Sequence, residues 1–240
     1  MKTQLARTLT GIAMALLVLG TAGCGSLLPK PPVAPTFYTL DEAPSSNSTG
    51  SSNGMKSSAA TRRPAASRSQ PTLAVNVPQA AAGYDSTRIV YTRQAQRLDT
   101  YANSVWIDTP AQMLKPMLVA AIESADVFPA VVSTPSAARA DIELDTQIVR
   151  LQHDFSSTPS RVRFALRVSL VDSVNRRVLA SEQFDAVADS LSEDARGGVV
   201  AAHAAVRGVL MRLPVLCSEA DIRWKADHKD MRAERTNVRP

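Results

Sequence analysis

Arg161-Val162-Arg163-Phe164-Ala165-Leu166-Arg167-Val168 places a large apolar side chain at every second position, with arginine at three of the positions between. Successive side chains of a β-strand point to opposite faces, so this spacing predicts a strand with one apolar and one charged face. A strand of this kind is half-buried, which is typical of an antiparallel sheet with one solvated face.

The segments on either side continue the pattern. Residues 142–150 alternate in the same way, residues 172–177 form a polar turn, and residues 178–184 are again strand-like. Together the three segments predict an antiparallel meander. Other strand-like segments are residues 36–40, 73–77, 88–93, 98–106 and 131–132.

Two helices are expected beside these strands. Thr109-Pro110 is a capping residue followed by proline at the first helical position, and apolar residues then recur at helical spacing. Pro116 either kinks this helix or marks its true start. Residues 190–193 resemble a capping box before a second helix, which we expect to end before Pro214. The predicted fold class is α+β: an antiparallel β-sheet with two main helices packed on it, preceded by a signal peptide and a Pro-rich tether.

Cys24 predicts where the protein resides. Lys2 and Arg7 precede a short apolar run, and small residues lead into the cysteine, which is the layout of an export signal. The pattern is typical of a bacterial lipoprotein signal, although Thr21 stands where leucine is usual. Acyl chains on Cys24, as a diacylglycerol and an N-acyl group, would anchor the mature chain firmly. The alternative is an ordinary secretory signal with an incidental cysteine.

The anchored chain is expected at the outer membrane, facing the periplasm. Gly25 follows the cysteine, and in lipoproteins of Gram-negative bacteria an aspartate there commonly marks inner-membrane retention. The four prolines of residues 24–35 favour an extended tether that holds the domain about 30 Å from the lipid.

If Cys24 is acylated, Cys217 has no other cysteine in the chain with which to form a disulfide. We expect it to be buried as a small hydrophobe, with an intermolecular disulfide as the alternative.

Charge and composition divide the remaining chain. Removing Lys2 and Arg7 lowers the net charge from +5 to +3, and residues 42–71 carry all of that remainder. The folded part is therefore near neutral, which argues against nucleic-acid binding. Residues 42–71 are read as a disordered insert, with contact to anionic lipid as the alternative. The expected organisation is a signal peptide (1–23), an acylated cysteine and tether (24–35), an α+β domain (36–217) and a charged C-terminal tail (218–240).

Motifs for catalysis or metal binding were not found in the sequence. None of the three histidines lies at metal-ligand spacing, and there is no nucleophile elbow or phosphate-binding glycine loop. We therefore expect no enzyme activity, no metal and no cofactor beyond the acyl chains of Cys24. The candidates for a partner site or lipid-facing patch are aromatic, and at least three of the five are expected to pack in the core instead: Phe37, Tyr38, Tyr84, Tyr101 and Trp106.

A series of weak motifs in a fixed order resembles one known family. The series consists of Cys24-Gly25-Ser26, Phe37-Tyr38-Thr39-Leu40, Ile89-Val90-Tyr91, Tyr101-Ala102-Asn103 before Trp106, Ala140-Asp141-Ile142-Glu143-Leu144, Arg163-Phe164-Ala165-Leu166 and Ala201-Ala202-His203-Ala204-Ala205. Over residues 24–213 the chain resembles the ABC-type transport auxiliary lipoproteins, which include intermembrane transport lipoproteins of the paraquat-inducible type. The insert is long for that family, and the tail beyond Pro214 finds no match.

This resemblance implies a function in lipid transport. The expected role is an auxiliary or docking subunit of an ABC transport system with an MCE-type (mammalian cell entry) subunit, moving phospholipid between inner and outer membranes. Its implied partners are the MCE-domain protein, the ABC permease and ATPase, and outer-membrane lipid, with a homo-oligomer compatible with this role. The alternatives are an independent periplasmic lipid carrier, a periplasmic hydrolase, and an assembly pilot for an outer-membrane pore.

Overall fold

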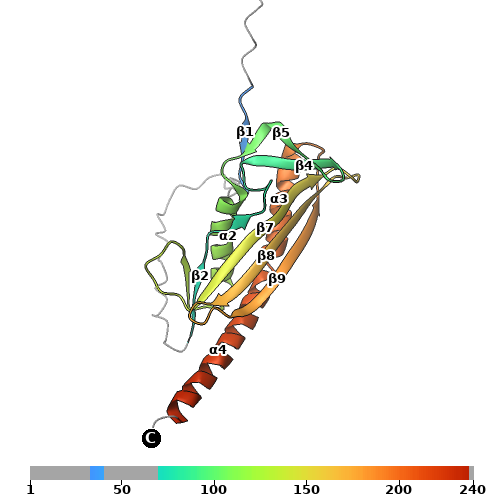
Figure 1. Ribbon diagram of the computed structural model, residues 1–240. Coiled ribbons are helices and arrows are strands. Elements are labelled where there is room, and N and C mark those ends of the chain that lie inside the picture. The colour runs from blue at the N-terminus through green and yellow to red at the C-terminus, as the bar shows by residue number, and fades with distance from the viewer. Residues whose placement is uncertain (1–32, 41–69, 238–240) are drawn as a thin grey trace, which may run out of the picture. The chain divides into compact units, whose positions relative to one another are not determined.

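Three long antiparallel strands form one side of the sheet (Figure 1). A computed structural model describes residues 33–40 and 70–237, and side chains up to residue 229, and all elements below belong to a unit that begins at Pro35. β7 (Ile142–Asp154), β8 (Arg161–Asp172) and β9 (Val178–Asp189) pair along nearly their whole lengths. Every second side chain of β8 is buried from Val162 to Leu170, so the meander predicted from residues 161–168 is confirmed.

The other edge of β7 carries strands that run parallel to it. β2 (Thr72–Val75), β3 (Gln79–Ala80) and β4 (Arg88–Gln94) pair with successive parts of β7. β6 (Ala130–Ser133) extends the sheet beyond β2. β5 (Arg97–Trp106) and then β1 (Thr36–Tyr38) extend it beyond β4.

The sheet is therefore mixed, and the prediction of an antiparallel sheet was wrong in this respect. β1 is parallel to β5, and β2 is parallel to both β6 and β7. Alternation within a segment predicts which face is buried, but it does not encode the direction of a neighbouring strand that is distant in the sequence.

Helices cover one face of the sheet (Figure 1), as expected for an α+β fold. α2 (Pro110–Ser124) packs near β2 and β6, and α3 (Ala195–Leu210) packs on β7, β8 and β9. Thr109 caps α2 by accepting a hydrogen bond from the Gln112 N–H at 3.4 Å. Pro116 lies inside this helix, so it does not mark its start.

The C-terminal part of the chain differs from the expected solvated tail. α4 (Leu213–Asn237) begins two residues after α3 ends and packs on β9 and β8. Leu216, Cys217, Ala220 and Trp224 are buried on its inner face. Trp224 packs in the core, so the domain extends beyond residue 217. A charged composition concealed this helix because only one of its faces is apolar enough to pack.

The start of α3 also differs from its prediction. Asp194, not Ser190, caps the helix, and its carboxylate accepts a hydrogen bond from the Gly197 N–H at 2.8 Å.

Residues 195–229, which include α3 and most of α4, are long and apolar enough to cross a membrane by length and composition. In the most apolar window of these residues, 44% of the window is buried in the protein.

The signal peptide, Cys24 and the insert are not part of this description. The signal (1–23), Cys24 with most of the tether, and nearly all of the insert (42–71) lie outside the described residues.

Cys217 is fully buried, and burial raises the pKa of its thiol to about 12. A thiol with that pKa remains protonated and inert, as the prediction of a small buried hydrophobe requires.

Candidate functional site

A bulge in β7 turns His153 towards the helices. From Ile142 to Ile148 the even-numbered residues of β7 face inwards, and the register then shifts between Ile148 and Arg150. An extra residue in one strand reverses the faces of all residues after it. Leu151 and His153 therefore lie on the buried face, and His153 is 2% exposed.

Two hydroxyl groups hold the imidazole ring of His153. The Tyr101 hydroxyl lies 2.9 Å from Nδ1, and the Ser160 hydroxyl lies 2.8 Å from Nε2. The Phe155 ring lies against the imidazole with a centroid distance of 4.2 Å. Residues from β5, β7 and the β7–β8 loop thus meet in one buried polar chain, in which both ring nitrogens have partners.

The first turn of α3 fits closely against this ring. A Cβ atom at Gly198 would lie 2.4 Å from Nδ1 of His153, and one at Gly197 would lie 2.2 Å from the Ser192 carbonyl oxygen. No side chain fits at either position without displacing its neighbour. Close packing against these neighbours therefore explains why two adjacent glycines stand inside the helix.

The electrostatic environment of the site favours a neutral imidazole. Burial lowers the pKa of His153, and the nearby carboxylates of Glu193, Asp154 and Asp194 only partly oppose this effect. Glu193 accepts the backbone N–H of Ser160 at 2.9 Å, and this hydrogen bond lowers the pKa of Glu193. Burial raises the pKa of Tyr101, so its hydroxyl stays protonated. The hydrogen-bonded side chains of Tyr101, His153 and Ser160 are therefore uncharged near neutral pH, and the nearby charges are the carboxylates of Glu193, Asp154 and Asp194.

A hydroxyl in contact with an imidazole is also the geometry of a nucleophile and its base. Here Ser160 has 0% exposure, so no substrate reaches its oxygen in this structure. Tyr101, rather than a carboxylate, contacts the other nitrogen of the ring. We call Tyr101, His153, Ser160 and Gly198 the latch, because their contacts hold β5, the β7–β8 loop and α3 together.

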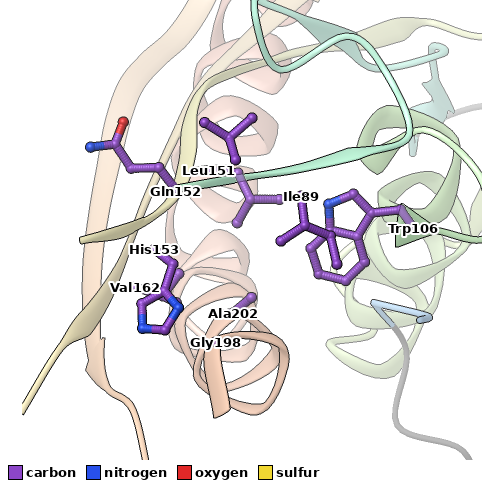
Figure 2. A pocket seen from close by; sticks show the side chains of 9 residues that line it. Ile89, Trp106, Leu151, Gln152, His153, Val162, Gly198 and Ala202 are labelled. Carbon is purple, nitrogen blue, oxygen red and sulfur yellow. The ribbon is translucent and has the colours of Figure 1, made fainter. Parts of the chain in front are cut away.

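A small cavity lies beside the latch, between the sheet and α3. Figure 2 shows the His153 ring next to Gly198 and Ala202 of α3, with Ile89 and Trp106 further along the wall. The volume that the centre of a water molecule can occupy is about 10 Å³. This is room for about one water, whereas pockets for ligands of drug size span roughly 300–1,000 Å³. Among the described residues, no group of three or more His, Cys, Asp or Glu side chains could hold a metal ion.

The five aromatic residues singled out from the sequence do not form one patch. Phe37, on edge strand β1, is 59% exposed, and Trp106 is buried in the core. Tyr38 is half-buried and pairs with Trp106 across β1 and β5. Tyr84 donates its hydroxyl to Gln152 at 2.6 Å, and Tyr101 belongs to the latch. Cys24 lies outside the described residues.

Sequence reasoning missed the latch itself. Its members stand at positions 101, 153, 160 and 198, and the bulge that turns His153 inwards has no signal in the alternation. The adjacent glycines at positions 197 and 198, unusual inside a helix, were the only local sign of a close contact.

Comparisons with known proteins agree with this fold. A family model described as "ABC-type transport auxiliary lipoprotein component" matches residues 54–212. The crystal structure of protein XCC0632 from Xanthomonas campestris is 25% identical, with a TM-score of 0.58 over 66% of this chain and 88% of that one. A second crystal structure, of an uncharacterized protein, is 12% identical, with a TM-score of 0.55 over 75% and 97% of the two chains. No curated protein matches.

Proposed function

The chain belongs to the ABC-type transport auxiliary lipoprotein family, and we propose that it docks an MCE-type ABC lipid transporter at the outer membrane. In this proposal the acyl chains of Cys24 anchor it in the periplasmic leaflet. The cargo is phospholipid, and the protein itself is neither an enzyme nor the source of energy. The MCE subunit and the permease and ATPase supply the conduit and the ATP hydrolysis.

The observation that carries the proposal is the family match together with the signal before Cys24. The match covers residues 54–212, which include every element from β2 to α3. The small residues that lead into Cys24 predict acylation there. A family of transport lipoproteins and a predicted lipid anchor are two independent indications of the same role.

The fold also suggests which end of the domain is nearest the anchor. The chain enters the domain at β1, which joins the sheet through β5 and β4 at the part of β7 that carries His153. Eleven residues separate Cys24 from Thr36 in the sequence, and a proline-rich chain of this length reaches about 30 Å when it is extended. We therefore propose that the tether reaches the domain through the β1 edge of the sheet.

The alternative of an independent lipid carrier is less well supported. A carrier needs a cavity that holds an acyl chain, whereas the cavity found among the described residues, beside His153, has room for about one water molecule. A docking role requires no cavity, only a surface.

Affinity purification of the full-length protein from native membranes in mild detergent tests the proposal, with proteins and lipids identified by mass spectrometry. Recovery of an MCE subunit with an ABC permease or ATPase is the expected result. Recovery of phospholipid without these subunits would favour the carrier. Recovery of neither, even after chemical crosslinking, would contradict the docking role.

A further inference from the structure

Two large apolar side chains are exposed side by side at the β1 edge of the sheet. Phe37 of β1 is 59% exposed, and Ile107, the residue after β5, is 56% exposed. Phe37 pairs with Val105 of β5, and Ile107 donates its backbone N–H to the Tyr38 carbonyl oxygen at 2.7 Å. We call Phe37, Val105 and Ile107 the edge patch.

All three side chains of the edge patch point away from the helices. Trp106 lines the small cavity beside α3, and Tyr38, its partner in β1, packs against the same core. Successive residues of a strand point to opposite faces of the sheet. The edge patch therefore lies on the face opposite the helices, and none of its members belongs to the hydrophobic core.

The edge patch is close in sequence to the predicted lipid anchor. Phe37 stands thirteen positions after Cys24, and an extended proline-rich chain of that length spans about 40 Å. Acyl chains on Cys24 would therefore keep the patch within this distance of the leaflet. Tethering of this kind raises the effective concentration of the lipid surface at the patch, so a weak contact suffices.

The size of the patch favours lipid over a protein partner. A specific protein interface buries about 800 Å² and roughly 20–30 residues on each side, which is far more than three side chains at a sheet edge provide. A membrane interface accepts single apolar side chains, and binding grows with the apolar area that leaves water.

The charges next to the patch favour neither partner. Arg88 is exposed and pairs with Val105 across β4 and β5, whereas Asp108 is exposed and follows Ile107. One group of each sign leaves this edge near neutral. We therefore expect burial of apolar surface, rather than attraction to anionic headgroups, to hold the contact.

We propose that the edge patch inserts into the interfacial layer of the membrane that holds the acyl chains of Cys24. This inference rests on the proposed function, because it needs the lipid anchor. The domain then rests on the lipid surface through β1 and β5. Two points of attachment fix the orientation of the domain on the membrane, which a tether alone does not do.

Photocrosslinking of the full-length lipoprotein in native membranes tests this inference. The photoreactive residue p-benzoylphenylalanine replaces Phe37, which keeps an apolar aromatic side chain at this position. The matched control carries it at Val187, which is 53% exposed on β9, the strand at the other side of the sheet. Five strand spacings, or about 24 Å, separate β9 from β1 across the sheet.

The expected adduct at position 37 is phospholipid, at a yield well above that at position 187. Mass spectrometry of the crosslinked protein identifies the adducts. A protein adduct at position 37, from another subunit or a second copy, would overturn the inference. Equal lipid yields at the two positions, or no adduct at position 37, would overturn it as well.

Substitution within the patch gives an independent measurement. Ile107→Asp should lower the lipid yield at position 37 about tenfold, because it removes an apolar side chain from the lipid contact and places a carboxylate there. Ile107→Leu should leave the yield unchanged, and so should Val187→Asp. Since Ile107 is exposed, none of these changes should alter the unfolding temperature.

The anchor and the edge patch fail in different ways. If the wild-type protein sediments with membranes and position 37 captures no lipid, the patch inference is wrong and the anchored docking function stands. If the wild-type protein stays in the soluble fraction, the anchor itself is wrong, and the patch inference falls with it.

Discussion

Substitution of Gly198 by alanine tests the packing of the latch against α3. Two effects oppose each other. Alanine favours a helix interior over glycine by about 1 kcal/mol. The added methyl group would lie 2.4 Å from Nδ1 and 3.1 Å from Cε1 of His153, so the ring must move. Overpacking of this kind costs about 1–3 kcal/mol.

Movement of the ring has a further cost. The imidazole is held between the Tyr101 and Ser160 hydroxyls at 2.9 Å and 2.8 Å, so any displacement stretches one of these buried hydrogen bonds. A buried polar group left without its partner costs about 1–3 kcal/mol. Together these two costs outweigh the gain in helix propensity, and we expect Gly198→Ala to lower the free energy of unfolding by about 1–5 kcal/mol.

Gly208 supplies the matched control. It lies in the same helix, and a Cβ atom there would meet nothing within 4 Å. Gly208→Ala should therefore leave the free energy of unfolding unchanged or raise it by up to about 1 kcal/mol. Urea unfolding followed by circular dichroism measures both. In a His153→Ala background, where the clashing ring is absent, the cost of Gly198→Ala should disappear. Equal effects of the two glycine substitutions in the wild-type background would refute the reasoning.

Three further predictions concern the latch and the anchor. The pKa of His153 is lower in the folded state than its value of about 6.5 when unfolded. The unfolded chain therefore binds more protons, and the stability from this residue is present above pH 6.5 and is lost as the pH falls below it. Urea unfolding between pH 7.5 and 5.5 should show this slope, and the slope should be smaller in His153→Gln; equal slopes would contradict the assignment. Ser160→Ala should lower the free energy of unfolding by about 1–3 kcal/mol, because Nε2 of His153 loses its buried partner; no loss in urea unfolding would show that the contact is dispensable. Cys24→Ala should move the protein from the membrane to the soluble periplasmic fraction in cell fractionation, and full retention in the membrane would contradict lipid anchoring.

Local sequence patterns predicted those parts of the fold that depend on local chemistry. The alternation of residues 161–168 gave β8 and its buried face, and Thr109-Pro110 gave the start of α2. The directions of the remaining strands did not follow from such patterns, because β2 and β4 meet β7 through contacts between segments more than 60 residues apart. Pairing over that range is decided by the packing of the whole domain.

The site was less predictable than the fold, for a related reason. Tyr101 was one of five candidates for a partner or lipid contact, but its hydroxyl contacts a histidine 52 positions later. The buried position of His153 depends on the bulge before Arg150. A bulge adds one residue to a strand, and the residue types of the strand do not show where it lies. The helix α4 was missed because charged side chains dominate residues 218–240, and they hid the apolar residues of its buried face.

Separation of membranes on a density gradient tests the docking role most directly. The sample is an envelope fraction in which inner and outer membranes are separated, and the MCE subunit of the transporter is quantified in each. The account predicts that a share of this subunit sediments with the outer membrane when the wild-type lipoprotein is present, and that the share is lost with Cys24→Ala. An unchanged distribution of the MCE subunit between the two membranes would contradict the account.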